Sequence, residues 1–113
     1  MVTNDLDQIR AYLERYQAHG DYVLTEGLKK LPGEGCAILS WHGKRVSLIC
    51  FNSLTRAELF LFIINRSALP DGPSSAQPRF SKVNKLMTAS WSLGDKIYLL
   101  AAPGDEEFLR KHL

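Results

Sequence analysis

The stretch GCAILSWHGKRVSLICF (Gly35 to Phe51) decides the fold, because it is typical of two short apolar strands joined by a His-Gly turn. Its ends carry both cysteines of the chain, Cys36 and Cys50. In a hairpin the loop length fixes which side chains share a face, since a slip of one residue moves every side chain to the other side. The register of this hairpin therefore decides what the two cysteines can do.

An even-length loop gives this hairpin one wholly apolar face and one partly polar face. A two-residue loop at His42 and Gly43 would pair Trp41 with Lys44, and a four-residue loop groups the side chains in the same way. Gly43 favours the two-residue form, because it supplies the positive φ that a tight turn requires. A sheet covered by helices on one side also favours such a division of faces. The apolar face would hold Ala37, Leu39, Trp41, Val46, Leu48 and Cys50.

A three-residue loop is the alternative, and it would place Cys36 directly across from Cys50. That register mixes apolar and polar side chains on both faces, so we favour the even loops. A disulfide between Cys36 and Cys50 is then disfavoured, and buried free thiols are the expectation. Cys36, His42 and Cys50 are also spaced too widely for a typical metal site, and no CxxC redox motif is present.

The whole chain predicts one packed domain, since 113 residues with 45% hydrophobic and 23% charged side chains can bury a core. Acidic and basic residues alternate and no basic run exceeds two residues, so we expect no nucleic-acid partner. The longest apolar run, Leu59 to Ile64, is too short to span a bilayer. The N-terminus shows no signal peptide, and membrane contact would need a segment absent from this chain.

The first segment predicts a helix over residues 5–19, with Asn4 as its N-cap and Gly20 at its C-terminal stop. Thr25 to Pro32 predicts a connector with a single helical turn. The chain ends in a predicted helix over 105–112, which Asp105 would cap. The apolar stripe of the first helix has spacings of three and four residues: Leu6, Ile9, Leu13 and Tyr16.

Five segments of strand length separate these helices, mostly joined by turn-rich sequence. Short connections predict antiparallel pairing. The fold class is therefore α+β, a sheet of about five antiparallel strands flanked by an N-terminal helix and a short C-terminal helix, within a single domain over 1–113. A Pro-rich loop over 66–80 is the expected mobile element. The predicted strands are 36–41, 45–51, 58–65, 86–92 and 96–101.

We expect neither a catalytic residue nor a cofactor, because the sequence has no phosphate loop, no nucleophile elbow and no His with a fixed carboxylate partner. His19, His42 and His112 are expected to be solvated. Aromatic and Arg side chains commonly anchor protein interfaces. Trp41 and Trp91 each end a strand just before a turn, and we expect them to seal the edge of the core. The alternative is a binding surface, whose candidate residues are Trp41, Arg45 and Phe51, expected as a patch on the less apolar face, and Trp91.

The segment ASWSLGDKIYLLA (Ala89 to Ala101), with the short helix after it, resembles the C-terminal extracytoplasmic domain of bacterial transmembrane anti-sigma-factor-like regulators. The resemblance runs from Gly35 to Leu113 without the Pro-rich loop. The N-terminal HxxxCxxC zinc segment and the membrane helix of that family are not in this chain. The resemblance implies an outward-facing sensing or protein-contact module, extracytoplasmic in its full context, and it transfers no catalytic residue.

Taken together, the sequence predicts a non-enzymatic regulatory or protein-interaction domain, with a protein partner or a homodimer. The alternative is a small-ligand-binding module with a pocket between the sheet and the Pro-rich loop. Without the resemblance, a cytoplasmic location would be expected.

Overall fold

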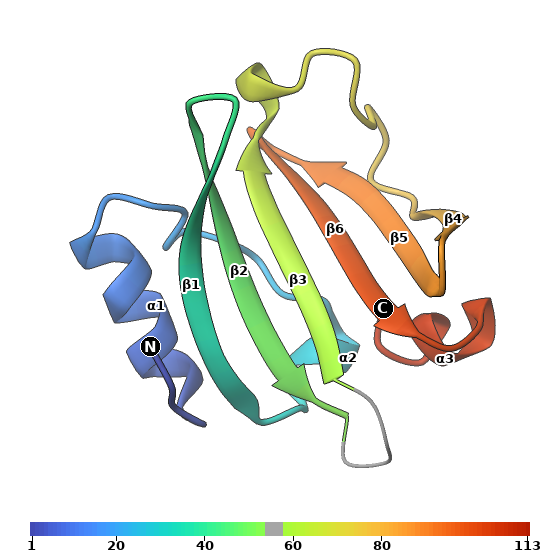
Figure 1. The fold of residues 1–113 in the computed structure, drawn as a ribbon, viewed down its shortest axis with the longest axis horizontal. Helices are drawn as coiled ribbons and strands as arrows, with labels where there is room; N and C mark the ends of the chain where they lie inside the picture. Colours follow the sequence, from blue (N-terminus) through green and yellow to red (C-terminus); the bar gives the residue numbers. More distant parts are fainter. Residues whose placement is uncertain (54–57) are drawn as a thin grey trace.

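The computed structural model describes residues 1–53 and 58–113 and contains one antiparallel sheet of six strands, in the order β1-β2-β3-β6-β5-β4. Every neighbouring pair is antiparallel, so the predicted α+β class is confirmed. Figure 1 shows the helices α1 and α3 at opposite ends of the sheet. The elements are α1 (Leu6–Arg15), α2 (Glu26–Lys29), β1 (Gly33–Trp41), β2 (Lys44–Asn52), β3 (Glu58–Asn65), the short 3-10 helix η1 (Arg66–Ala68), β4 (Arg79–Val83), β5 (Leu86–Leu93), β6 (Lys96–Pro103) and α3 (Glu106–Arg110).

The β1–β2 hairpin has the two-residue loop that the sequence favours. Trp41 pairs with Lys44, and the turn residues His42 and Gly43 have φ values of 50° and 75°. Positive φ at both positions is the signature of a type I′ turn, whose twist matches that of the strands. Cys36 lies opposite Ile49 and therefore on the other face from Cys50.

The sixth strand, β4, corrects the predicted count of five, because it begins at Arg79, near the end of the loop predicted over 66–80, and continues to Val83. Phe80 pairs with Ala89 of β5 and packs against the core. The Arg110 guanidinium lies 4.4 Å from the centre of the Phe80 ring. Two apolar side chains, Phe80 and Val83, at a spacing of three residues do not make the alternation of a strand, and short polar strands are typical of a sheet edge.

Helix α1 ends four residues earlier than predicted, at Arg15. Gln17 adopts a φ of 56°, and the Ala18 and Gln17 amides donate to the carbonyls of Leu13 and Glu14. These two bonds form a Schellman motif, so Gln17 takes the left-handed position that the sequence analysis gave to Gly20. At the other end the cap is Asp5 rather than Asn4, since the Asp5 carboxylate accepts the Asp7 amide at 2.9 Å.

The two remaining helices are short and capped as the sequence predicts. Thr25 accepts the Leu28 amide at the start of α2, and Asp105 accepts the Phe108 amide at the start of α3. Leu28 and Leu109 are fully buried, so each helix docks by its apolar side. Among the described residues, no helix has the length and apolar character needed to cross a membrane.

The core lies between the helices and one face of the sheet. In Figure 1 the connector from α1 to α2 passes behind the strands, so the view is onto the face that these helices leave open. Ile9 and Leu13 of α1 are fully buried in this layer. The sheet residues buried in the core are Cys36, Ile49, Phe51, Leu59, Leu61, Ile63, Ala89, Trp91, Tyr98, Leu100 and Ala102.

The covered face is the partly polar face of the hairpin, not the wholly apolar one. Its polar side chains find partners in the connector after α1: Arg45 Nη1 donates to the Tyr16 carbonyl at 2.6 Å, and Ser47 contacts His19. A buried polar side chain is tolerated when it is hydrogen-bonded. The apolar face predicted for the core therefore faces away from the helices.

Candidate functional site

The face of the sheet opposite the helices carries a broad apolar surface across β1, β2, β3 and β6. Register and alternation place its side chains together, and all of them are half-buried or exposed. We call this surface the open face. It consists of Ala37, Leu39, Trp41, Val46, Leu48, Cys50, Phe60, Phe62, Ile64 and Leu99.

The most exposed part of the open face is the tip of the β1–β2 hairpin. Leu39 is 40% exposed and Trp41 is 44% exposed. The Trp41 indole packs edge-on against the His42 ring, with the ring centres 4.3 Å apart. A large aromatic side chain held at a sheet surface is a common anchor for a protein partner.

A cavity of about 390 Å³ lies where the Pro-rich loop meets the open face. Trp41 and Phe62 line it from the sheet, and Leu69 and Pro73 line it from the loop. Ser90 supplies the single polar side chain of the lining. The predicted position of a pocket, between the sheet and the Pro-rich loop, therefore matches this cavity.

The two ends of the open face carry opposite charges. Lys44 stands at the hairpin end of β2, and Glu58 stands at the start of β3, opposite Asn52 at the far end of β2. Both side chains are exposed and share the open face by alternation. Burial raises the pKa of the neighbouring Cys50 thiol, and the carboxylates of Glu58 and Glu34 raise it further, so the Glu58 end is acidic.

The predicted interaction residues do not form one surface. Trp41 belongs to the open face, but Arg45, Phe51 and Trp91 lie on the helix-covered side. Phe51 is fully buried and Trp91 is 5% exposed, stacked on Tyr98 with ring centres 5.5 Å apart. Arg45 binds the connector carbonyls. Of the four candidates, only Trp41 is available to a partner on the open face.

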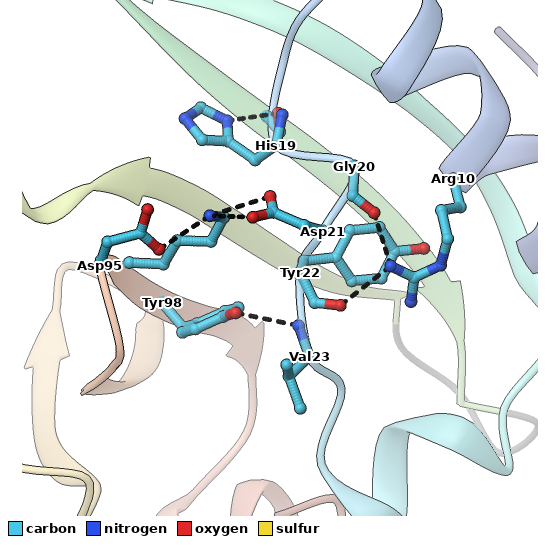
Figure 2. Close-up of polar contacts among 10 residues, drawn as sticks. Arg10, His19, Gly20, Asp21, Tyr22, Val23, Asp95 and Tyr98 are labelled. Atoms are coloured by element: carbon cyan, nitrogen blue, oxygen red, sulfur yellow. Dashed lines mark hydrogen bonds and ion pairs between the residues drawn. The ribbon is translucent and has the colours of Figure 1, made fainter.

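The covered face holds a polar cluster around the connector that follows α1, which Figure 2 shows in close-up. Arg10 Nη1 donates to the carbonyls of Gly20 and Tyr22, and its guanidinium stacks 4.1 Å from the centre of the Tyr22 ring. The Val23 amide donates to the Tyr98 hydroxyl at 2.9 Å. These bonds fix the connector against both the helix and β6.

Lys96 ties the same connector to the sheet through two carboxylates. Its side chain is 5% exposed, and Nζ lies 2.9 Å from Asp21 and 3.0 Å from Asp95. Burial lowers the Lys96 pKa, but hydrogen bonds to both aspartates outweigh it, so the net pKa is raised. The hydrogen bond from Lys96 lowers the pKa of Asp21. Lys96 is therefore charged and paired with two carboxylates, and it is not a candidate base.

His19 is 5% exposed, which corrects the expectation that it is solvated. Ser47 Oγ accepts the His19 backbone amide at 3.3 Å and lies 2.7 Å from His19 Nδ1. Because the Ser47 oxygen already accepts one hydrogen bond, its own proton is free to donate to a neutral Nδ1. Burial, with the Lys96 charge as the next cause, lowers the His19 pKa and favours this neutral form.

A polar pocket of about 440 Å³ borders this cluster, between the connector and the ends of β3 and β6. Although His19 and Ser47 form a pair, Ser47 is fully buried and cannot reach a substrate in the pocket. No three His, Cys, Asp or Glu side chains in residues 1–53 and 58–113 are grouped to hold a metal ion. The arrangement orders the connector and presents no nucleophile.

Cys36 and Cys50 are both free thiols and lie on opposite faces of the sheet. Cys36 is buried under the helices, whereas Cys50 is half-buried on the open face. Burial raises the pKa of each thiol, so neither has the lowered pKa of a reactive cysteine.

The sequence predicts the residues that the hairpin contributes to the open face, but it does not predict that this face lies away from the helices. The residues FLFII of β3 are all apolar, and successive side chains of a strand point to opposite faces, so both faces of β3 are apolar. The sequence of β3 therefore does not say which face the helices cover. The deciding signal is the polar pair Arg45 and Ser47, which requires partners from the connector.

Comparison of the chain with protein-family models, curated proteins and solved structures gave no match.

Proposed function

We propose that this chain is a non-enzymatic protein-interaction domain that holds its partner on the open face. The observation that carries the proposal is an apolar surface spanning four adjacent strands that no helix covers, with the Pro-rich loop packed only over its β6 end near Ile97. Contiguous exposed apolar surfaces of this kind mark contact sites in proteins, because burying them releases free energy in proportion to area.

The arrangement favours binding over catalysis. The open face carries no titratable pair, and its ionic groups stand at the two ends rather than around the cavity. A partner surface with apolar side chains at its centre would fill the area between them. Trp41 and Leu39 would supply the exposed anchors.

The resemblance of Ala89 to Ala101 to anti-sigma-factor-like regulators suggests a context for this proposal. In such a regulator the domain would be the extracytoplasmic module that senses or contacts another protein. The proposal does not depend on that context, because it rests on the uncovered sheet face.

Photo-crosslinking in cells that make the protein tests the proposal. A photoreactive phenylalanine analogue replaces Leu39 on the open face in one variant. The matched control replaces Val23, which is 51% exposed in the connector on the covered side. We expect discrete adducts from position 39 that are lost when Phe62→Asp is added, and none from position 23.

Absence of adducts from position 39, or equal adducts from both positions, would contradict a partner on the open face. The Phe62→Asp variant must retain the circular dichroism spectrum of the parent, so that loss of adducts reports the surface and not unfolding.

A second candidate function is binding of a small apolar ligand, favoured by the cavity under the Pro-rich loop. Its lining predicts a mostly hydrocarbon ligand with one polar group for Ser90. Ser90→Phe fills the cavity and leaves Leu39 and Leu48 untouched. Saturable binding of a medium-chain fatty acid, abolished by Ser90→Phe, would support this function, and no binding to the parent would exclude that class of ligand.

A further inference from the structure

We infer that the partner on the open face is a second copy of this chain, stacked sheet on sheet with the strands of the two copies antiparallel. The inference rests on the proposed function, because it names the occupant of the same surface. Its basis is the separation of charge along the strands, with Lys44 at one end and Glu58 at the other.

Two copies related by a two-fold axis can stack their open faces in two aligned ways. If the axis runs parallel to the strands, the hairpin end of one sheet lies over the hairpin end of the other, and the Lys44 side chains of the two copies come together. If the axis runs across the strands, the direction reverses, and Lys44 of one copy faces Glu58 of the other. Because the interface is isologous, this second arrangement forms the ion pair twice.

The arrangement with the axis across the strands also brings the apolar surfaces of the two copies together. An axis across the strands places each strand over its own copy, so the apolar half of the sheet meets the apolar half. The other half, made by β4 and β5, carries polar side chains on this side, including Thr88 and Ser90. Aligned packing of two sheets at about 10 Å separation is a common way to close a sheet face.

The size of the open face sets the expected strength. Four strands about 4.8 Å apart, each contributing about six residues of about 3.3 Å, cover roughly 400 Å². Stable interfaces bury about 800 Å² on each partner. We therefore expect a reversible dimer whose population depends on concentration, rather than an obligate one.

Sedimentation equilibrium of the full chain with a set of charge variants tests this inference. Lys44→Glu alone and Glu58→Lys alone each create two like-charge contacts, and we expect each to weaken dimerisation roughly tenfold at low salt. The double variant Lys44→Glu with Glu58→Lys restores both pairs with reversed sign, so its dimerisation should return to within about twofold of the parent. Lys82→Glu is the control, since Lys82 is exposed on the helix-covered side.

Weakening by both single variants and recovery in the double variant support the antiparallel dimer. A parent that stays monomeric up to millimolar concentration overturns the second copy as occupant, while adducts of another protein at position 39 would still support the proposed function. A dimer that the charge variants do not change, or that Lys82→Glu weakens equally, overturns the stacking.

Discussion

At the scale of single residues, the histidine buried under the connector shows how a polar side chain can be part of the fold without taking part in chemistry. Neutral His19 accepts a hydrogen bond from the Ser47 hydroxyl, and the charges that act on its ring are those of Lys96, Asp21, Asp95 and Arg45. Protonation would remove the acceptor and add a third positive charge to those of Lys96 and Arg45.

The lowered pKa of His19 predicts that the free energy of unfolding falls in mild acid. The unfolded chain has the ordinary histidine pKa of 6.5 and takes up a proton below it, whereas the folded chain resists. The stabilising contribution is therefore complete above pH 6.5 and is lost progressively as the pH falls toward the lowered folded pKa. Urea unfolding at about pH 8 and about pH 5 measures this loss.

The variant His19→Asn isolates the residue, because an amide oxygen can accept the Ser47 hydroxyl without titrating. We expect a smaller loss of stability between the two pH values in this variant. Burial also lowers the pKa of His112, so His112→Asn should remove a separate share of the same loss. An unchanged pH dependence in His19→Asn would show that His19 is not the titrating group.

At the scale of elements, the β1–β2 turn fixes the register on which both faces depend. Gly43 has a φ of 75°, and a Cβ at this position would meet no atom within 4 Å. A substitution there consequently costs backbone strain alone. Left-handed backbone costs an L-residue about 1 to 2 kcal/mol.

Gly43→Ala should therefore destabilise the chain by about 1 kcal/mol while leaving the fold unchanged. His42→Asn is the matched comparison, because asparagine tolerates the left-handed region at the same turn, and it should have no cost. Chemical denaturation measures both. Equal free energies of unfolding for the parent and Gly43→Ala would contradict the type I′ turn.

The elements also show what the sequence could predict. The hairpin register followed from Gly43 and the alternation around it, and the capped helices followed from Thr25 and Asp105, because these signals are local. Strand β4 was missed because Phe80 and Val83 are its only apolar side chains, although its partner strand β5 follows directly in the sequence. The stacking of buried Trp91 on Tyr98 agrees with the expectation that Trp91 seals the edge of the core. Which face the helices cover depended on the Arg45 and Ser47 contacts, and no local pattern contains those.

At the scale of the whole molecule, the two faces of the sheet differ in what they contribute. Leu61 is fully buried on the covered face, whereas Leu39 is 40% exposed on the open face. Removal of a buried leucine side chain loses both its burial and the packing around it.

We expect Leu61→Ala to destabilise the chain by about 2 to 5 kcal/mol and Leu39→Ala by less than about 1 kcal/mol, measured by urea unfolding of the dilute protein. Leu39→Ala should instead weaken contacts on the open face. Equal destabilisation by the two variants would mean that the open face is part of the core of the isolated chain.

The central claim, that a protein partner covers the open face, is tested most directly by the rate at which a maleimide alkylates Cys50. Cys50 lies on the open face and Cys36 lies under the helices, so Cys36 serves as the internal control. In cells that make the protein, Cys50 should react several-fold more slowly than in dilute purified protein, with no change at Cys36. Equal rates at Cys50 in the two conditions would contradict the claim.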